Sequence, residues 1–308
     1  MFSVIFPGQG SQIVGMGKEF FDKYEIVKKL FREADEILET NLSKIILEGP
    51  KEDLDLTANT QPAIFLISYS IFRVVKDEFS INLNKGKFFA GHSLGEYSAL
   101  SCAGILNFAE TIKILRIRGN AMQTSVPKGE GGMLAVLGSK IEDIEKILKD
   151  NENNFMAQIA NDNSEGQIVV SGKIKDLDRM SLFLKDKKIK NLKLPVSAPF
   201  HCELMTKATE IMREELGKLN FNKSDNTLIS NVTADKILDL NELKDLLISQ
   251  IEKRVRWRES IINMINYGVD HFIEIGPGKV LSGLIKRIDK NVKITSINNQ
   301  SDIESLKI

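Results

Sequence analysis

The stretch "FFAGHSLGEYSAL" (residues 88–100) places Ser93 between two glycines, Gly91 and Gly95, each two positions away. The apolar residues before the serine predict a strand, and the small residues after it predict a helix. Where a strand turns tightly into a helix, glycines make room for the turn and a serine hydroxyl projects from it, as in a nucleophile elbow. We therefore predict that Ser93 is a nucleophile. The alternative is an ordinary glycine turn with a solvated serine.

Short strands and helices alternate on both sides of this stretch. "SVIF" (residues 3–6) predicts a strand and "EIVKKLFREADEIL" (25–38) predicts an amphipathic helix. The longest apolar run, "PAIFLISYSIF" (62–72), is far short of the roughly 20 residues that span a bilayer and predicts a buried helix. Such alternation is typical of a mostly parallel sheet covered by helices. We expect an α/β fold whose large domain is α/β-hydrolase-like.

The rhythm changes in the middle of the chain, where the order of predicted elements is strand, helix, strand, strand, helix, strand. The turn between the two central strands is predicted at "DNSEG" (162–166). This β-α-β-β-α-β order is that of a ferredoxin-like unit. We therefore expect an inserted ferredoxin-like subdomain at residues 129–197 that interrupts an α/β catalytic domain made of residues 1–128 and 198–308.

The last third of the chain returns to the first pattern. "TLISNV" (227–232) predicts a strand, "LKDLLISQIEKRVRW" (243–257) lies within one predicted helix, and "DHFIEIG" (270–276) predicts a second strand. These elements complete the large domain.

A serine nucleophile needs a general base, which is most often histidine. His92 is next to Ser93, so the two side chains point apart, and His271 lies in a predicted strand, where a structural role is expected. His201, in the loop "SAPFHCEL", remains as the predicted base. Cys202 follows His201 directly in the sequence, so their two side chains also point apart, and we give thiol chemistry at Cys202 little weight.

Two other glycine clusters fail the patterns of phosphate sites. "FPGQGSQIVGMG" (6–17) lacks the third glycine of a dinucleotide fingerprint, and "GPGKVLSG" (276–283) lacks the Ser or Thr that follows lysine in a phosphate loop. The first cluster follows a strand, and a backbone turn there is placed to donate an N–H group to an oxyanion.

Composition narrows the classes of function. The 308 residues include 42 Lys and Arg against 42 Asp and Glu, so no overall basic field favours nucleic acid or an anionic membrane. Two cysteines are too few for a disulfide framework or a zinc site. A strand-like segment begins almost at Met1. We expect a cytoplasmic protein, with an organellar form that has lost a targeting segment as the alternative.

Six motifs occur along the chain in a recognisable order. With these motifs the sequence resembles the malonyl-CoA:acyl-carrier-protein transacylases of dissociated fatty-acid synthesis, over essentially its whole length. The motifs are "FPGQGSQIVGMG", "GHSLGEYSAL", "ILRIRGNAMQ", "SAPFH", "SQIEKRVRW" and "EIGPGKVL".

The resemblance implies a reaction. A malonyl group passes from malonyl-CoA to the phosphopantetheine thiol of acyl carrier protein through a malonyl-serine intermediate, by a ping-pong mechanism that supplies fatty-acid elongation. It implies that the partners are the carrier protein and malonyl-CoA, with no cofactor or metal bound by the enzyme. We also expect a monomer, although the sequence itself does not give the oligomeric state.

The resemblance also assigns roles to residues. Arg116 and Arg118 are two positions apart on a predicted helix, so their side chains face different directions and only one can be the carboxylate-binding arginine. Sequence periodicity does not choose between them. The resemblance selects Arg118. Phe200 stands where many bacterial members have serine and related malonyl-selective modular acyltransferases often have phenylalanine, which favours malonyl. The implied roles are nucleophile for Ser93, base for His201, oxyanion-binding N–H for Gln9 and Leu94, histidine-orienting carbonyl for Gln250, and substrate contacts for Arg118, Met122, Asn161 and Phe200.

Two alternatives remain open. A serine esterase or thioesterase explains Gly-x-Ser-x-Gly equally well, but it needs no buried arginine after the elbow and normally supplies an acidic third member. A catalytically silent module that binds a carrier protein would keep Ser93 and His201 only as structural relics.

Overall fold

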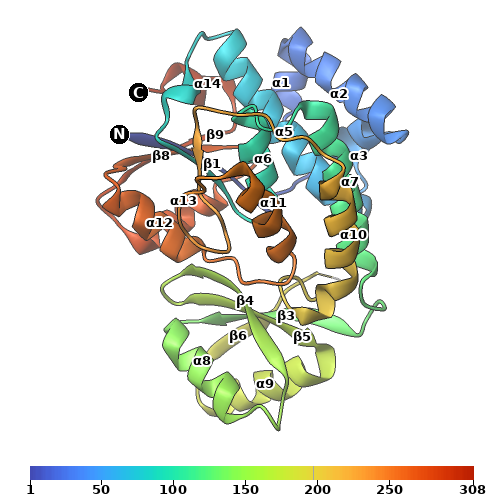
Figure 1. The fold of residues 1–308 in the computed structure, drawn as a ribbon, viewed down its shortest axis with the longest axis vertical. Helices are drawn as coiled ribbons and strands as arrows, with labels where there is room; N and C mark the ends of the chain where they lie inside the picture. Colours follow the sequence, from blue (N-terminus) through green and yellow to red (C-terminus); the bar gives the residue numbers. More distant parts are fainter. Residues whose placement is uncertain (197) are drawn as a thin grey trace.

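The computed structural model describes residues 1–196 and 198–308. It contains two sheets that lie in separate parts of the molecule (Figure 1). The larger part is α/β with a parallel sheet, and the smaller part is built on an antiparallel sheet. Within the described residues, no helix is both long and apolar enough to cross a membrane.

The five-stranded sheet has the order β7-β2-β1-β8-β9, and each of its neighbouring pairs is parallel. The central strand is fully buried at Val4, Ile5 and Phe6, as expected for a strand covered by helices on both faces. The strands are β1 (Phe2–Phe6), β2 (Phe88–Gly91), β7 (Thr227–Leu228), β8 (His271–Ile275) and β9 (Lys293–Ile297).

Helices surround this sheet. Helix α5 is buried along most of its length, which confirms the helix predicted at residues 62–72. The helices are α1 (Lys18–Lys23), α2 (Glu25–Leu38), α3 (Leu42–Glu48), α4 (Lys51–Leu54), α5 (Thr57–Asp77), α6 (Gly95–Cys102), α7 (Phe108–Thr124), α10 (Thr206–Gly217), α11 (Leu240–Ser249), α12 (Trp257–Asn266), α13 (Val280–Ile288) and α14 (Gln300–Glu304), with short 3-10 turns η1 (Leu83–Lys85) and η2 (Glu203–Met205).

The smaller part has the predicted element order. Its sheet runs β4-β5-β3-β6, with antiparallel pairing throughout. Alternate side chains such as Leu134, Val136 and Val170 pack against Ile144 and Leu177 of the two helices, so the part has its own core. Its elements are β3 (Gly131–Leu137), α8 (Ile141–Asp150), β4 (Ala157–Ser164), β5 (Gln167–Lys173), α9 (Ile174–Asp186) and β6 (Lys190–Lys193).

Strand β4 attaches the smaller part to the larger one. The N–H of Val255 donates to the Ala160 carbonyl at 2.8 Å, and the N–H of Asp162 donates to the Val255 carbonyl at 2.9 Å. The buried Asp162 carboxylate also pairs with Arg258 of α12 at 2.9 Å. The two parts are therefore joined at β4 as well as by the connecting segments. Residue 197, the predicted boundary between them, lies outside the described residues.

Three expectations differ from the structure. The predicted turn at 162–166 is shorter, because β4 continues to Ser164. The strand predicted at 227–232 ends at Leu228, after which Ile229 bridges Lys236. The continuous helix predicted over 243–257 is wrong: α11 ends at Ser249 and α12 begins at Trp257. The backbone between them leaves the helical path, since Val255 pairs with β4 there.

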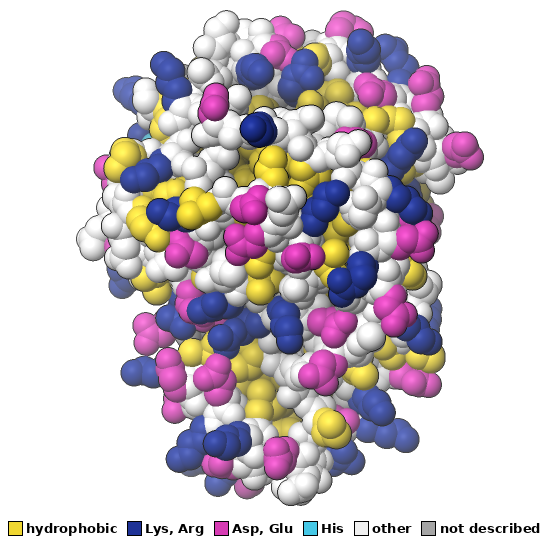
Figure 2. Space-filling model, viewed as in Figure 1, with side chains coloured by type: hydrophobic (Ala, Val, Ile, Leu, Met, Phe, Trp, Pro, Cys, Tyr) yellow, Lys and Arg dark blue, Asp and Glu magenta, His cyan; other side chains and the backbone are white. Residues whose placement is uncertain are grey.

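The surface carries charge of both signs. Figure 2 shows Lys and Arg side chains interspersed with Asp and Glu over the visible face, as the equal totals of the two charge types suggest. No single-sign field dominates this face.

Candidate active site

Ser93 occupies a tight turn between β2 and α6, as the sequence predicts. A Cβ atom on Gly91 would lie 1.9 Å from the Gly95 carbonyl carbon, and one on Gly95 would lie 2.3 Å from the Phe6 oxygen. A side chain at either position would therefore clash with the backbone, so both positions require glycine. Ser93 itself has a φ of 54°, in the left-handed region that costs a residue other than glycine about 1 kcal/mol or more.

His201 faces Ser93 from the segment that returns the chain to the larger part. Its Nε2 lies 2.8 Å from Ser93 Oγ, and its Nδ1 lies 2.7 Å from the main-chain oxygen of Gln250. Because a carbonyl oxygen only accepts, Nδ1 carries the proton and Nε2 is free to accept one from the serine. Burial, and then the nearby Arg118 cation, lowers the pKa of His201 to about 3, so the imidazole is neutral at ordinary pH.

The other histidines have structural partners. His92 Nε2 lies 2.7 Å from Asn163 Oδ1, and its ring packs against Trp257 at a centroid distance of 5.7 Å. His271 Nε2 lies 2.9 Å from Thr295 Oγ1. Neither hydrogen bond involves Ser93, in agreement with the elimination argument that selected His201.

Cys202, beside His201, forms no hydrogen bond with Ser93 or His201 within the described residues. Its Sγ donates to the Pro199 carbonyl at 3.1 Å, and burial raises the pKa of its thiol to about 11. A thiol that stays protonated is a poor nucleophile.

Arg118 of α7 is the arginine that reaches the site. Only 1% of its surface is exposed. Its Nη2 donates to Ser93 Oγ at 3.2 Å and to Gln250 Oε1 at 2.8 Å, while Nη1 donates to Gln61 Oε1 at 2.8 Å. The guanidinium also lies over the Tyr97 ring at 5.5 Å.

Arg116 points elsewhere, toward Asn59 and Thr40. Met122 is buried one turn beyond Arg118, and its sulfur accepts from Gln61 Nε2 at 3.7 Å. The helix therefore separates the two arginines as its geometry requires, and Met122 lies on the Arg118 side.

Arg118 is a buried cation that forms no salt bridge with any residue the structure describes. Burial lowers its pKa, and the Coulombic influence of Glu96 opposes this shift. An arginine nevertheless stays protonated in proteins, and buried charges are normally paired. Its Nε also has no hydrogen-bond partner within the described residues. A ligand carboxylate would supply the missing charge and acceptors.

The predicted oxyanion donors lie on two turns that touch. A Cβ on Gly8 would lie 2.6 Å from the His92 oxygen, so the turn containing Gln9 packs against the elbow. Among the described residues, no acceptor bonds the main-chain N–H of Gln9 or of Leu94. Leu94 also precedes the first turn of α6, where free N–H groups favour negative charge.

Asn161 and Phe200 lie on segments beside the site. Asn161 is buried in β4 and forms a bridge with Val255. Phe200 is buried next to His201, and its carbonyl accepts from Ser171 Oγ at 2.5 Å. Within the described part of the chain, neither side chain hydrogen-bonds Ser93 or His201, so their role in substrate binding stays a prediction.

Sequence reasoning missed several polar side chains around Ser93. Gln61 and Glu96 are buried in α5 and α6, and Asn231 follows β7. The side chain of Gln250 was also missed, because only its carbonyl was expected to act. The available signal was a polar residue next to an apolar run, as Gln61 is in "QPAIFLISYSIF".

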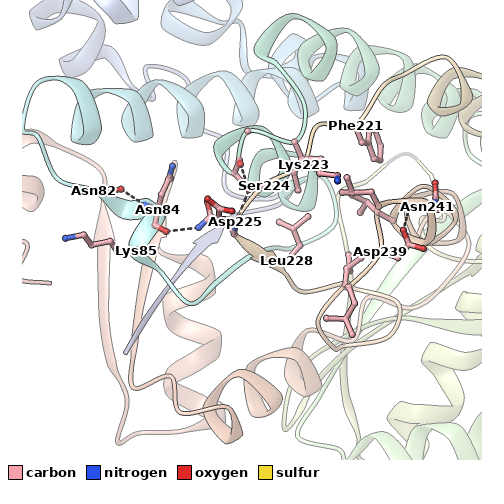
Figure 3. Close-up of a pocket in the computed structure, with 18 residues that line it drawn as sticks. Asn82, Asn84, Lys85, Phe221, Lys223, Ser224, Asp225, Leu228, Asp239 and Asn241 are labelled. Carbon is pink, nitrogen blue, oxygen red and sulfur yellow. Dashed lines mark hydrogen bonds between the residues drawn. The ribbon is translucent and has the colours of Figure 1, made fainter.

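A cavity of about 1100 Å³ lies elsewhere. Figure 3 shows its lining side chains coming from the segments around Asn84, Ser224 and Asp239, and none of Ser93, His201 or Arg118 lines it. A second cavity of about 360 Å³ is lined in part by Cys202, and none of Ser93, His201 or Arg118 lines it. The arrangement of nucleophile, base and arginine does not depend on either one.

Comparison with known proteins places this geometry in a family. Residues 3–304 match the model of the acyl transferase domain. The "Malonyl CoA-acyl carrier protein transacylase" of Bacillus subtilis (strain 168) is 44% identical over 302 residues, which cover 97% of this chain and 94% of the relative.

Solved structures agree. An acyl-carrier-protein-S-malonyltransferase from Bartonella henselae has a TM-score of 0.95 at 42% identity, over 99% of this chain and 97% of that one. A malonyl-transacylase in complex with its type II PKS acyl-carrier protein has a TM-score of 0.94 at 34% identity, over 99% and 98% of the two chains. The chain is an acyltransferase and belongs to the malonyl CoA-acyl carrier protein transacylase family.

Proposed function

We propose that this enzyme transfers the malonyl group of malonyl-CoA to the phosphopantetheine thiol of acyl carrier protein through a malonyl-serine intermediate. The observation that carries the proposal is the approach of Arg118 Nη2 to within 3.2 Å of Ser93 Oγ. An esterase needs no buried cation beside its nucleophile, whereas an acyl group with a distal carboxylate does. The names of the relatives support the same substrate pair.

In the first half of the reaction, His201 Nε2 takes the proton of Ser93 Oγ as Oγ bonds to the thioester carbonyl carbon. The N–H groups of Gln9 and Leu94 stabilise the negative oxygen that forms. Collapse of this intermediate breaks the carbon–sulfur bond. The coenzyme A sulfur leaves with the proton from Nε2, and the malonyl ester of Ser93 remains.

The second half reverses these roles. The phosphopantetheine thiol gives its proton to His201 Nε2, and its sulfur attacks the ester carbonyl. The carbon–oxygen bond breaks, and Ser93 Oγ recovers the proton. The two half-reactions share one site and one covalent intermediate, so the kinetics are ping-pong.

The base is matched to a thiol acceptor. A carbonyl behind His201 stabilises an imidazolium less than the carboxylate of a hydrolase triad does, and burial lowers the pKa of His201 further. Thiols ionise far more readily than water, with a pKa of about 8.5 for a free cysteine. A weak base therefore suffices for transfer to a thiol and disfavours loss of malonyl to water.

Arg118 selects the acyl group in this scheme. A planar guanidinium can hold a carboxylate by two parallel charge-assisted hydrogen bonds, which lysine cannot do. The buried Met122 supplies an apolar wall beside it, with Asn161 and Phe200 as further substrate contacts.

The remaining proposals concern the domain limits, the fold description, the location and the oligomeric state. The domain limits 1–128 with 198–308, and 129–197, follow the change of sheet along the chain. The parallel sheet with its serine elbow supports an α/β-hydrolase-like description, and the β-α-β-β-α-β order a ferredoxin-like one. We further propose a cytoplasmic monomer that binds no cofactor or metal.

One experiment tests the function. The protein is mixed with malonyl-CoA labelled in the malonyl group, and label is followed on the protein and in free malonate. Stable label on the protein that moves to holo acyl carrier protein on its addition is expected. Steady release of malonate without carrier protein would instead indicate a thioesterase, and no adduct by intact mass would indicate a silent binding module.

A further inference from the structure

The strained conformation of Ser93 is held by a side chain that the reaction scheme does not use. Gly91 and Gly95 make space for the elbow, but space alone does not hold Ser93 at its positive φ. Asn231 lies directly behind the turn and is 1% exposed. We propose that Asn231 is a positioning residue that clasps the nucleophile elbow, an inference that rests on the proposed function of Ser93.

The amide of Asn231 bonds the backbone on both sides of the turn. Its Oδ1 accepts from the N–H of Ser93 at 2.7 Å, and its Nδ2 donates to the carbonyl of Gly91 at 2.7 Å. The Ser93 N–H can only donate and the Gly91 oxygen can only accept, so these partners fix which end of the amide is which. An isosteric carboxylate would place an oxygen against the Gly91 oxygen, and leucine would satisfy neither group.

The backbone of Asn231 is itself anchored. Its N–H donates to Glu96 Oε2 at 3.2 Å, and its carbonyl accepts from the N–H of Arg256 at 2.9 Å. The preceding strand β7 pairs with β2, which leads into the elbow. Asn231 is therefore anchored to the same sheet that carries the serine.

Asn231 is also linked to the predicted base, His201, through other buried polar side chains. Gln250 Nε2 donates to Glu96 Oε2 at 2.7 Å and to the Ser93 carbonyl at 3.1 Å, while the Gln250 carbonyl holds His201 Nδ1. One buried polar network thus connects the turn that presents Oγ with the segment that orients the imidazole. Asn231 touches no reacting atom and acts through the position of Ser93.

The test compares Asn231→Asp and Asn231→Leu with wild type. Asn191→Asp is the control, since the side-chain amide of Asn191 likewise bonds main-chain carbonyls, those of Ser181 and Ile189, but in the smaller part. Three quantities are measured: the limiting rate of acyl-enzyme formation on rapid mixing with malonyl-CoA, the half-saturating malonyl-CoA concentration, and the rate of Ser93 labelling by a fluorophosphonate. All are measured well below each variant's thermal midpoint.

Displacement of a reacting group by about 1 Å costs roughly a hundredfold in rate. We therefore expect both Asn231 variants to lower the acylation and labelling rates by about ten- to a hundredfold, with half-saturation within about twofold of wild type because Arg118 is untouched. The control should match wild type in all three.

Rates within about twofold of wild type in both Asn231 variants would overturn the proposal. So would rates that recover fully on cooling, because the loss would then reflect only unfolded protein. If wild type forms no malonyl adduct, the proposed function fails, but the labelling rates still decide whether Asn231 positions Ser93.

Discussion

The main-chain oxygen of Gln250 lies 2.7 Å from Nδ1 of His201, on the side of the imidazole away from Ser93. A carbonyl in this position fixes the tautomer and direction of the ring without adding a negative charge. Burial and, after it, the Arg118 cation lower the pKa of the imidazole and oppose its protonation. Proton transfer at this site therefore depends on geometry more than on the strength of the base.

Ser93→Ala should abolish the acyl-enzyme. Removal of Oγ deletes the atom that lies 2.8 Å from His201 Nε2 and would carry the ester. After incubation with malonyl-CoA, intact-mass analysis should find one malonyl group on wild type and none on the variant. An adduct of the same mass on Ser93→Ala would mean that another residue is the nucleophile.

His201→Ala should lower malonyl transfer by about 10² to 10⁴, the usual cost of losing a general base. His271→Ala is the matched control, because the side chain of that histidine bonds only Thr295 among the described residues. Initial rates of transfer to holo carrier protein are measured for both, with circular dichroism to verify folding. An equal loss in both variants would count against the assignment of the base.

Gln250→Ala should lower malonyl transfer about tenfold or more. The main-chain oxygen that bonds His201 survives this change, but Arg118 Nη2 and Glu96 lose their hydrogen bonds to the side chain. A hydrogen bond to a charged group contributes about 1.5 to 3 kcal/mol. The sequence alone suggests a mild effect, since only the carbonyl was expected to act. A rate within twofold of wild type would favour that simpler view.

Glu96 should make stability fall as pH rises. Burial raises the pKa of Glu96 to about 7 from an ordinary value of 4.5, so between these values the folded state holds a proton that the unfolded state has lost. This contribution is fully present below pH 4.5 and is lost as pH rises through 7. At 1.36 kcal/mol per pKa unit, a shift from 4.5 to about 7 corresponds to about 3 kcal/mol.

The measurement is the free energy of unfolding of wild type and Glu96→Gln from pH 4.5 to 8. Other titrating groups also change stability with pH, and His201 with its lowered pKa acts in the opposite direction, but these groups are common to both proteins and cancel in the difference. As pH rises, the free energy of unfolding of Glu96→Gln should increase relative to that of wild type. A difference that is constant with pH would show that the pKa of Glu96 is not raised.

Local patterns predicted much of this fold. The helix over 25–38 and the strand, turn and helix around Ser93 are where periodicity and glycine spacing place them. The break between Ser249 and Trp257 was missed, because apolar spacing there is compatible with a helix while a tertiary contact, the pairing of Val255 with β4, decides the backbone. Strand β9 was missed as well.

In the site too, some residues could be predicted from local sequence patterns and others depend on tertiary contacts. Ser93 and His201 could be predicted because a motif and the small number of histidines restrict the choice. Glu96, Asn231 and the Gln250 side chain could not, because their importance comes from contacts across 135 to 157 residues of sequence. No local pattern encodes which buried polar groups will meet.

Arg118→Ala should change the choice of acyl group rather than simply lower activity. Malonyl differs from acetyl by a distal carboxylate, and Arg118 is the buried cation next to Ser93 Oγ. Charge-assisted hydrogen bonds of this kind are worth about 1.5 to 3 kcal/mol, which corresponds to a ten- to over a hundredfold loss of malonyl transfer. Acetyl transfer should not fall with it, because a methyl group makes no such bond and an unpaired buried charge disfavours it.

The comparison that decides this is the ratio of malonyl to acetyl transfer in wild type, Arg118→Ala and Arg116→Ala. Arg116 is the matched control: it lies on the same helix, but its guanidinium bonds Asn59 and Thr40, away from the serine. The ratio should collapse only in Arg118→Ala. An unchanged ratio there would refute the carboxylate clamp, and a collapse in Arg116→Ala alone would mean that the helix presents the other arginine to the substrate. Lysine at position 118 should restore the ratio only in part, since it returns the charge without the planar pair of donors.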